Sequence, residues 1–208
     1  MAKMKPYYAE PGIVIYNGDC RDILPHLEPV DLVLTDPPYG LKEKIHDGGG
    51  WSTNPIYDAV LKWDIKIKDS DIAVVLSKGK NSVIWGGNYY CLPPSRCWLI
   101  WSKINSVPTM ADAELAWTSW DKNTRVFREI INADGNREHP TQKPISLMRW
   151  CIKQDVSQTI LDPFMGSGTT LRAAKDLGRK AIGIEIEEKY CEIAVKRLQQ
   201  EVFNFKNG

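Results

Sequence analysis

A strand, a glycine-rich turn and the start of a helix follow one another in Thr159-Ile160-Leu161-Asp162-Pro163-Phe164-Met165-Gly166-Ser167-Gly168-Thr169-Thr170. Asp162 ends the apolar run, at the edge where open α/β sheets bind their ligands. The glycines let the backbone approach a ligand closely, and free amide groups at the start of the next helix favour negative charge. The stretch therefore predicts one unit of an α/β fold with a ligand at its turn; a tight turn that binds nothing is the alternative.

A second acid supports the ligand interpretation. Glu185 ends the next predicted strand, residues 181–185, where an acid can accept hydrogen bonds from both hydroxyls of a ribose. The turn is not a G-x-G-x-x-G fingerprint, because Thr169 and Thr170 follow Gly168, and it is not a P-loop, because Gly-Lys-Ser/Thr is absent from the sequence. Strand, acid, Gly-x-Gly, helix and second acid together indicate a nucleoside cofactor.

Strands and helices alternate along the rest of the chain. Seven apolar runs predict strands, at residues 13–16, 32–34, 83–85, 98–101, 115–119, 159–161 and 181–185. Helical patterns at 69–78, 146–154, 169–177 and 187–202 lie between several of them. This alternation indicates a mostly parallel sheet covered on both faces. The three close strands between residues 83 and 119 predict one antiparallel pair at the sheet edge.

A third acid ends the strand at residues 32–34 and begins Asp36-Pro37-Pro38-Tyr39. The two prolines stop the strand. An acid and an aromatic ring at the carboxyl end of a strand suit the binding of a planar ring that carries an exocyclic amine. A turn that only ends the strand is the alternative.

Two further segments carry polar groups. Asp19 and Cys20 close the first strand, where Asp19 either contributes to a site or caps a short helix. His139-Pro140-Thr141-Gln142-Lys143-Pro144 precedes a predicted helix, and its two prolines hold the backbone. Its lysine could meet a carboxylate, and its threonine and glutamine could hydrogen-bond one. No proton-transfer role is assigned to its histidine.

Composition narrows the class of protein. The 208 residues suffice for one domain with a real core. A net charge of +1 gives no sign of the strong basic field typical of nucleic-acid-binding proteins, although basic residues can still gather on one face. The five cysteines form no Cys-x-x-Cys pair and no zinc spacing, which favours free thiols in a reducing cytoplasm. The sequence contains neither a signal-peptide pattern nor the roughly 20 apolar residues that span a bilayer.

Taken together, these motifs resemble those of the amino-methylating DNA methyltransferases, which transfer a methyl group from S-adenosylmethionine (SAM) to the exocyclic amine of adenine or cytosine. Residues 35–40 are similar to the catalytic motif of that family, residues 162–169 to its SAM motif, and Glu185 to its ribose-binding acid. The catalytic motif precedes the SAM motif, and this permuted order resembles the beta group. The order also separates the chain from protein glutamine methyltransferases with an Asn-Pro-Pro-Tyr turn.

The resemblance, which covers nearly the whole chain, implies a set of site residues. The implied catalytic residues form one turn: Asp36, Pro37, Pro38 and Tyr39. The implied SAM-binding residues come from five segments: Asp19, Cys20, Asp36, Thr141, Gln142, Lys143, Asp162, Phe164, Gly166, Ser167, Gly168, Thr169 and Glu185. No metal site is expected.

The resemblance also implies the architecture and the partners. We expect a Rossmann-like SAM methyltransferase fold with a seven-stranded, mostly parallel sheet and one antiparallel edge strand, in a single catalytic domain over residues 1–208. Long recognition domains of the family precede the His-Pro-Thr-Gln-Lys-Pro loop, where this chain has only a polar, exposed insertion at 121–138. We therefore expect double-stranded DNA to be recognised by a short segment, by loops, or jointly with a second subunit of a homodimer. Small methylases of this kind occur in phages and prophages.

Two segments flank the expected site. The glycine-rich residues 41–51 form either a lid or a plain surface loop. Basic residues beside this segment and the insertion are candidates for phosphate contacts or ordinary surface charges: Lys42, Lys44, Lys122, Arg125, Arg128 and Arg137.

Adenine is the favoured target, because the cytosine enzymes of the family more often have Ser in place of Asp36. A cytosine amine methylase is the nearest alternative. A Rossmann oxidoreductase would need G-x-G-x-x-G and a redox pocket. A DNA-binding protein without catalysis would not need an intact Asp36.

Overall fold

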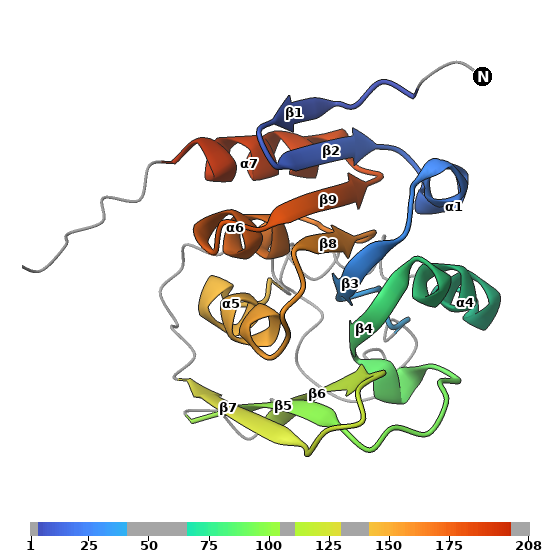
Figure 1. The fold of residues 1–208 in the computed structure, drawn as a ribbon, viewed down its shortest axis with the longest axis vertical. Coiled ribbons are helices and arrows are strands. Elements are labelled where there is room, and N and C mark those ends of the chain that lie inside the picture. The colour runs from blue at the N-terminus through green and yellow to red at the C-terminus, as the bar shows by residue number, and fades with distance from the viewer. Residues whose placement is uncertain (1–3, 41–65, 105–110, 130–141, 201–208) are drawn as a thin grey trace, which may run out of the picture.

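The computed structural model describes residues 4–40, 66–104, 111–129 and 142–200. Within these ranges nine strands form one sheet, in the order β1-β2-β9-β8-β3-β4-β6-β5-β7 (Figure 1). The strands are β1 (Tyr8–Glu10), β2 (Ile13–Asn17), β3 (Val30–Thr35), β4 (Gly79–Trp85), β5 (Trp98–Lys103), β6 (Ala113–Thr118), β7 (Arg125–Glu129), β8 (Thr159–Asp162) and β9 (Lys180–Glu185). The helices are α1 (Cys20–Ile23), α4 (Asp69–Ser77), α5 (Ile145–Lys153), α6 (Thr169–Asp176) and α7 (Glu188–Gln199), with 3-10 turns η1 (Leu24–His26) and η2 (Gly87–Tyr89).

Five neighbouring strands of the sheet, β2, β9, β8, β3 and β4, run parallel, which confirms the predicted mostly parallel sheet. All four predicted helices are present. The central parallel strand β3 is buried on both faces: its Leu32, Val33 and Leu34 have no exposed surface. Continuous apolar runs are typical of such strands, and this is why the sequence pattern located them.

The predicted count of seven strands is wrong, because β1 and β7 were missed. Both are edge strands, β1 antiparallel to β2 and β7 parallel to β5. An edge strand has less surface to bury and so needs fewer apolar residues. Residues 121–129 of the predicted insertion are mostly exposed, as expected, but they include the unpredicted strand β7, whose Phe127 packs on Trp150 of α5 with ring centroids 5.3 Å apart.

The antiparallel pairing also differs from the prediction. Strand β6 is antiparallel to both neighbours, β4 and β5, but it lies inside the sheet, with β5 and β7 beyond it. Because β6 runs against the other strands, its beginning lies at the edge where β3, β4 and β5 end. Residues at the start of β6 can therefore reach the ligand-binding edge of the sheet.

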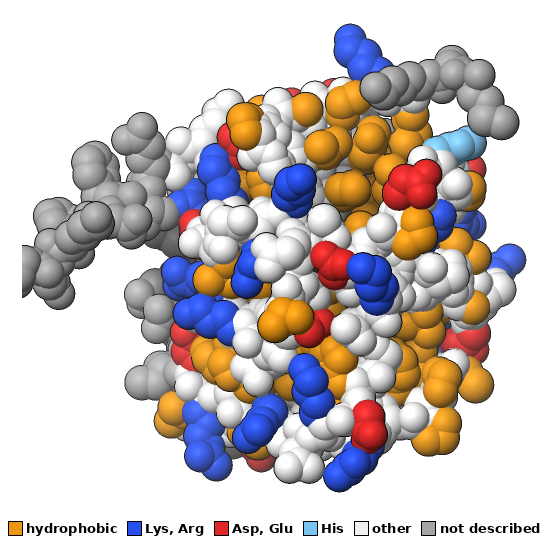
Figure 2. Space-filling view, in the orientation of Figure 1, with side chains coloured by type: hydrophobic (Ala, Val, Ile, Leu, Met, Phe, Trp, Pro, Cys, Tyr) orange, Lys and Arg blue, Asp and Glu red, His pale blue; other side chains and the backbone are white. Residues whose placement is uncertain are grey.

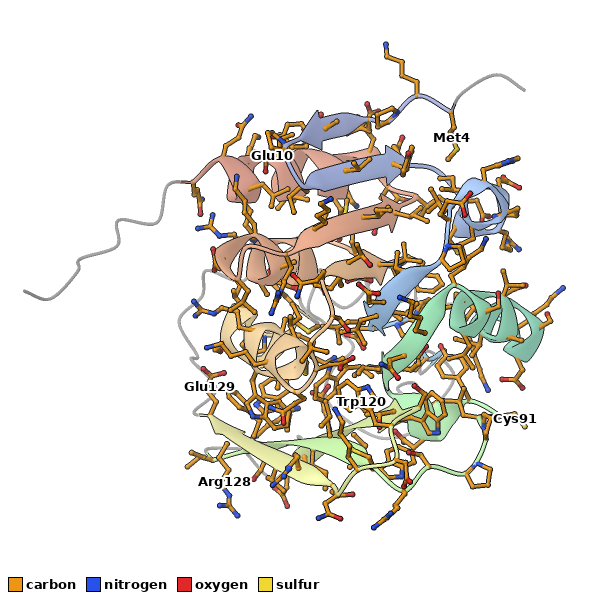
Figure 3. All side chains as sticks on the ribbon, viewed as in Figure 1. Met4, Glu10, Cys91, Trp120, Arg128 and Glu129 are labelled. Atoms are coloured by element: carbon orange, nitrogen blue, oxygen red, sulfur yellow. The ribbon has the colours of Figure 1, made fainter. Side chains whose placement is uncertain are left out.

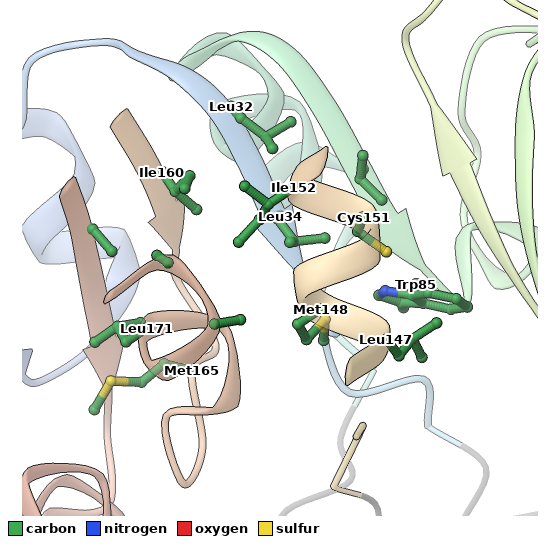
Figure 4. Packing of buried hydrophobic residues seen from close by; sticks show 14 of the residues in the cluster. Leu32, Leu34, Trp85, Leu147, Met148, Cys151, Ile152, Ile160, Met165 and Leu171 are labelled. Atoms are coloured by element: carbon green, nitrogen blue, oxygen red, sulfur yellow. The ribbon is translucent and has the colours of Figure 1, made fainter. Parts of the chain in front are cut away.

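Two hydrophobic cores cover the two faces of the sheet. On one face α5, α6 and α7 pack against the strands through side chains such as Leu147, Leu171 and Leu198 (Figures 1 and 4). On the other face α1 and α4 pack through Ile23 and Val75. Neighbouring strand residues alternate between these cores, and the resulting three layers are those of a doubly wound α/β fold.

Among the described residues, none of the helices could span a membrane. The described part of the chain also contains no cluster of three His, Cys, Asp or Glu side chains suited to a metal ion.

Candidate active site

A cavity of about 450 Å³ opens at the edge of the sheet where β3, β8 and β9 end. Its volume lies within the roughly 300–1,000 Å³ usual for small-molecule sites. Twelve of the predicted site residues line it: Asp19, Cys20, Asp36, Pro38, Gln142, Lys143, Asp162, Phe164, Gly166, Ser167, Thr169 and Glu185. The cavity thus joins five separate segments of the sequence.

Three predicted site residues do not line the cavity: Pro37, Tyr39 and Gly168. Gly168 has φ +79°, and a Cβ there would lie 2.7 Å from Cβ of Ala194. Its role in this structure is to let α7 pack closely on the turn. Thr141 lies outside the described residues, as do His139, the segment 41–51, Lys42, Lys44 and Arg137.

Glu185 ties the glycine turn to the next strand. Its Oε2 accepts a hydrogen bond of 3.0 Å from the amide of Gly166, and its Oε1 accepts one of 2.9 Å from the amide of Glu187. Burial raises the pKa of this carboxyl, while the two amides oppose the increase. The bonds orient the carboxylate at the wall of the cavity, where its remaining lone pairs can accept hydrogen bonds from ribose hydroxyls.

Asp162 is 3% exposed, and its Oδ1 accepts two hydrogen bonds. Oδ1 accepts from the hydroxyl of Thr35 at 2.6 Å and from the amide of Phe164 at 3.2 Å. Burial raises the pKa of the carboxyl to about 6, against the opposing effects of Thr170, Thr35 and the amide of Phe164. At neutral pH this charge is therefore held in the fold against a desolvation cost.

We expect Asp162→Asn to stabilise the protein above pH 6 in the absence of any ligand. Asparagine can place its oxygen where Oδ1 lies and keep both hydrogen bonds, but it carries no charge. Because the folded pKa of about 6 exceeds the unfolded value of 3.8, the native state binds the proton more tightly. A shift of about two pKa units is worth about 3 kcal/mol, so the ionised carboxyl costs about that much well above pH 6 and nothing below the unfolded pKa. Urea unfolding between pH 3.5 and 8 measures the difference between the two proteins.

Asp31 is the control for this experiment, because its pKa is shifted in the opposite direction. Lys80 and Thr159 donate to its carboxylate and hold its pKa well below the usual value. Asp31→Asn should therefore lower stability at pH 7, and the loss should disappear as the pH falls. A pH-independent effect of Asp162→Asn would contradict the desolvated charge at that site.

Asp19 caps a short helix and also lines the cavity. Its Oδ1 accepts a hydrogen bond of 2.9 Å from the amide of Arg21 and caps α1, and the carboxylate also pairs with the guanidinium of Arg21. The hydrogen bonds from Arg21 lower the pKa of Asp19. Asp19 and Arg21 both line the cavity, on the wall formed by the end of β2.

Asp36 follows β3 directly and is held from two sides. Its Oδ2 accepts from Nζ of Lys143 at 2.6 Å, and its Oδ1 accepts from the hydroxyl of Tyr39. Burial raises the pKa of Asp36, and Lys143 and Tyr39 act against this increase. A carboxylate has about four lone-pair positions, so an ionised Asp36 can still accept a hydrogen from a ligand in the cavity.

Tyr39 belongs to a small aromatic group beside the cavity. Its ring stacks on Tyr89, with centroids 5.0 Å apart and planes at 24°. Gly86, with φ +63°, makes this possible, because a Cβ there would collide with the ring of Tyr39. The hydroxyl of Tyr90 donates to the carbonyl oxygen of Pro38 and holds the proline turn.

The residues proposed for phosphate contacts differ in their surroundings. Lys122 donates to the carbonyl oxygen of Gln154 at 2.8 Å and lies over the ring of Trp120. Arg125 and Arg128 of β7 are exposed, and Figure 3 shows Arg128 pointing away from the sheet. In Figure 2, basic side chains gather on the part of the surface formed by β5 and β7. Two of the described candidates thus remain accessible to a polyanion.

Sequence reasoning missed three charged residues that support the site: Lys103, Glu114 and Arg197. Arg197 donates to the carbonyl oxygen of Ser167 at 2.5 Å and to Oε1 of Gln142 at 3.1 Å, so it joins the glycine turn to the segment that carries Lys143. Its position on the apolar side of the helical pattern, between Ala194 and Leu198, was the available signal. A charge on the buried face of a helix needs a partner in the interior.

A family model described as DNA methylase, N6_N4_Mtase, matches residues 93–196, which is half of the chain. Two Type II methyltransferases are similar to it in sequence. M2.DpnII of Streptococcus pneumoniae is 28% identical over 252 aligned residues, covering 95% of this chain and 93% of that protein. M.HinfI of Haemophilus influenzae is 29% identical, and the alignment covers 89% of this chain and 68% of that protein. The first alignment is longer than this chain, so that relative contains segments which this chain lacks.

Two solved structures show the same fold. M1.HpyAVI in complex with SAM has a TM-score of 0.61 at 24% identity, covering 90% of this chain and 100% of that one. PvuII DNA methyltransferase, described as cytosine-N4-specific, has a TM-score of 0.64 at 18% identity, covering 95% and 90%. The predicted Rossmann-like methyltransferase fold is thereby confirmed.

Proposed function

The chain belongs to the N6_N4 family of DNA methylases, and we propose that it transfers a methyl group from SAM to the exocyclic amine of adenine in DNA. One observation carries the proposal: the Asp36 turn and the Gly166 turn open into the same cavity. A methyl acceptor held by the first turn and a nucleoside cofactor held by the second would therefore meet. Neither turn alone could bring the two reactants together.

The residues of the cavity fit SAM. Glu185 lies where a ribose would bind, and Gly166 leaves open space beside it, because a Cβ there would meet no atom within 4 Å. Gln142 and Ser167 also line the cavity and could hydrogen-bond a carboxylate. The methyl group comes from the sulfonium of SAM, whose S–C bond breaks with its electron pair left on sulfur while the amine lone pair forms the N–C bond.

Asp36 prepares the amine for this transfer. The lone pair of an aromatic amine is delocalised into the ring, and this makes the nitrogen a poor nucleophile. Asp36 accepts one amine hydrogen and the carbonyl of Pro37 accepts the other, which favours a pyramidal nitrogen with its lone pair toward the methyl group. The positive charge that develops on the nitrogen is stabilised by the Asp36 carboxylate. The amine proton leaves afterwards.

The base must leave the duplex to reach this cavity. Flipping costs a few kcal/mol, and stacking on an aromatic side chain returns about 1–3 kcal/mol. Tyr39, which lies beside the cavity in the same turn as Asp36 and Pro38 and is held by Tyr89, would supply the stacking surface at the cavity's border. The chain acts on double-stranded DNA in the cytoplasm as a single catalytic domain. Because it lacks segments that its relatives contain, site recognition is carried by loops or shared with a second subunit.

Adenine is proposed as the target because Asp, and not Ser, begins the proline turn. A cytosine amine remains the second candidate, because PvuII DNA methyltransferase, described as cytosine-N4-specific, has the same fold. The fold therefore does not distinguish adenine from cytosine as the target, and the choice depends on the residues of the cavity.

Methyl transfer from labelled SAM to unmethylated genomic DNA, followed by nucleoside analysis, tests the proposal. We expect the label in N6-methyladenine. Label in N4-methylcytosine would establish the second candidate. No label in DNA, with a SAM-binding protein, would contradict the proposed function. RNA and denatured DNA serve as comparison substrates for the preference for double-stranded DNA.

A further inference from the structure

Four charged side chains form a continuous line that starts at Asp36. Nζ of Lys143 lies 2.6 Å from Oδ2 of Asp36 and 3.0 Å from Oε2 of Glu114. The other oxygen of Glu114, Oε1, lies 2.6 Å from Nζ of Lys103. Negative and positive groups alternate, and each contact is short enough for a charge-assisted hydrogen bond.

The sheet topology brings these residues together. Lys103 ends β5, and Glu114 lies near the beginning of the antiparallel strand β6, so both reach the edge at which β3 ends before Asp36. Glu114 is paired in register with Trp101, two residues before Lys103 on β5. Lys143 comes from the segment that precedes α5. No two members of the line come from the same strand or helix.

Because the two lysines of the line are buried, their ammonium groups must be paired with carboxylates. The side chains of Lys143 and Lys103 are 5% and 7% exposed, so each ammonium needs a partner within the protein. Burial alone would lower the pKa of Lys143, but Asp36 and Glu114 together raise it above its usual value. Lys143 therefore remains charged and is shared between two carboxylates.

This sharing has a consequence for Asp36, given the function proposed above. An ammonium beside Asp36 opposes the positive charge that develops on the reacting amine. It also occupies one carboxylate oxygen. Glu114 draws on the same ammonium from the other side and supplies a compensating negative charge. Without Glu114, Lys143 would have Asp36 as its carboxylate partner in this line.

We propose that Glu114 is a positioning residue for methyl transfer, which holds Lys143 between two carboxylates and balances its charge so that Asp36 can accept the amine. The inference rests on the proposed function and adds to it a residue outside both motifs. Glu114 does not line the cavity, so it acts through Lys143 and not on a ligand.

The charge of Glu114 should also be visible in the pH dependence of the reaction. The pKa of Asp36 is raised by burial and by the charge of Glu114. Lys143 and Tyr39 lower it. Asp162, the next acid along this edge, also interacts with Asp36 electrostatically. Removing the charge of Glu114 therefore lowers the pKa of Asp36. Because the ionised carboxylate is the active form, the acid limb of the rate profile should move to lower pH.

Glu114→Gln is the decisive variant. We expect kcat at pH 7.5 to fall at least about tenfold, a part of the 10²–10³-fold expected when electrostatic stabilisation is lost altogether. The acid limb of kcat should move to lower pH, and the calorimetric Kd for SAM should change less than about threefold. A residue that only supports the fold would change neither the position of the limb nor the ratio of kcat to SAM affinity in this way.

Two companion variants keep the test decisive. Glu114→Asp retains the charge, so its acid limb should stay at the wild-type pH even where its rate is reduced. Glu129→Gln is the matched control. Glu129 lies on β7, outside the line of charges, and its Oε1 accepts a hydrogen bond of 2.6 Å from the hydroxyl of Ser146. It should leave rate and profile unchanged. If Glu114→Gln does not fold, Glu114→Asp becomes the test. An acid limb at lower pH in Glu114→Asp than in the wild-type protein would then overturn the proposal.

The outcomes separate this inference from the proposed function. A wild-type protein that methylates DNA, together with an unshifted profile and normal rate for Glu114→Gln, would contradict the role of Glu114 alone. A wild-type protein that binds SAM and transfers no methyl group to DNA would contradict the proposed function, and the role of Glu114 with it.

Discussion

Replacing Asp36 by alanine is expected to reduce methyl transfer to DNA by at least about 10²–10³-fold, the range seen when one preorganised electrostatic contact to a transition state is lost. The variant loses both the acceptor for the amine hydrogen and the charge that stabilises the methylated nitrogen. The fold should survive, because the buried ammonium of Lys143 keeps Glu114 as a partner. Single-turnover transfer from labelled SAM measures the loss.

The affinity for SAM separates chemistry from binding in this variant. Glu185, Gly166 and Ser167 line the cavity from other segments of the chain, and the substitution leaves them in place. We therefore expect the calorimetric Kd to change by no more than several-fold. Asp36→Asn, which has nearly the same shape, should be as inactive as Asp36→Ala, because its amide carries no charge. Normal methylation by either variant would show that the assigned mechanism is wrong.

Replacing Gly166 by leucine is expected to weaken SAM binding by about 5–150-fold. Gly166 lines the cavity with φ +50°, and the space beside it is open. A side chain there would occupy volume that the cofactor needs, and overpacking of this kind costs about 1–3 kcal/mol, which corresponds to that loss of affinity. Isothermal titration calorimetry with SAM measures the effect.

Gly178→Leu is the matched control for this variant. Gly178 has a similar backbone conformation, φ +65°, and similar open space, but it follows α6 at the opposite edge of the sheet. Both substitutions place a side chain at positive φ and should lower the melting temperature to a similar degree. Only Gly166→Leu should lose SAM affinity. Equal affinities in the two variants would contradict the cofactor site.

The parts of the fold that the sequence predicted are those with a strong local signal. The centres of β3, β8 and β9 are apolar and largely buried, so a single window of sequence sufficed to locate them. Strands β1 and β7 gave weaker signals because they lie at the edges of the sheet. Polar residues 125–129 form a strand because β5 offers free hydrogen-bonding groups and Trp150 covers Phe127.

Most of the candidate site was predictable for a related reason. Asp36, Asp162 and Glu185 each end a strand, and parallel strands end at the same edge, so local sequence and one rule of topology bring them together. The rule does not extend to an antiparallel strand. Glu114 reaches the same edge from the beginning of β6, where a search for strand ends does not look.

The sequence by itself determined the fold class, the order of the two motifs and the acids of the cavity, because each depends on residues adjacent in the chain or on strands of one direction. Only the tertiary structure decided which group Lys143 meets. Its ammonium lies between Asp36 and Glu114, two carboxylates that come from different strands. The partner of a buried charge is set by the packing of elements that are distant in sequence, because the charge binds whichever opposite group the fold brings within reach.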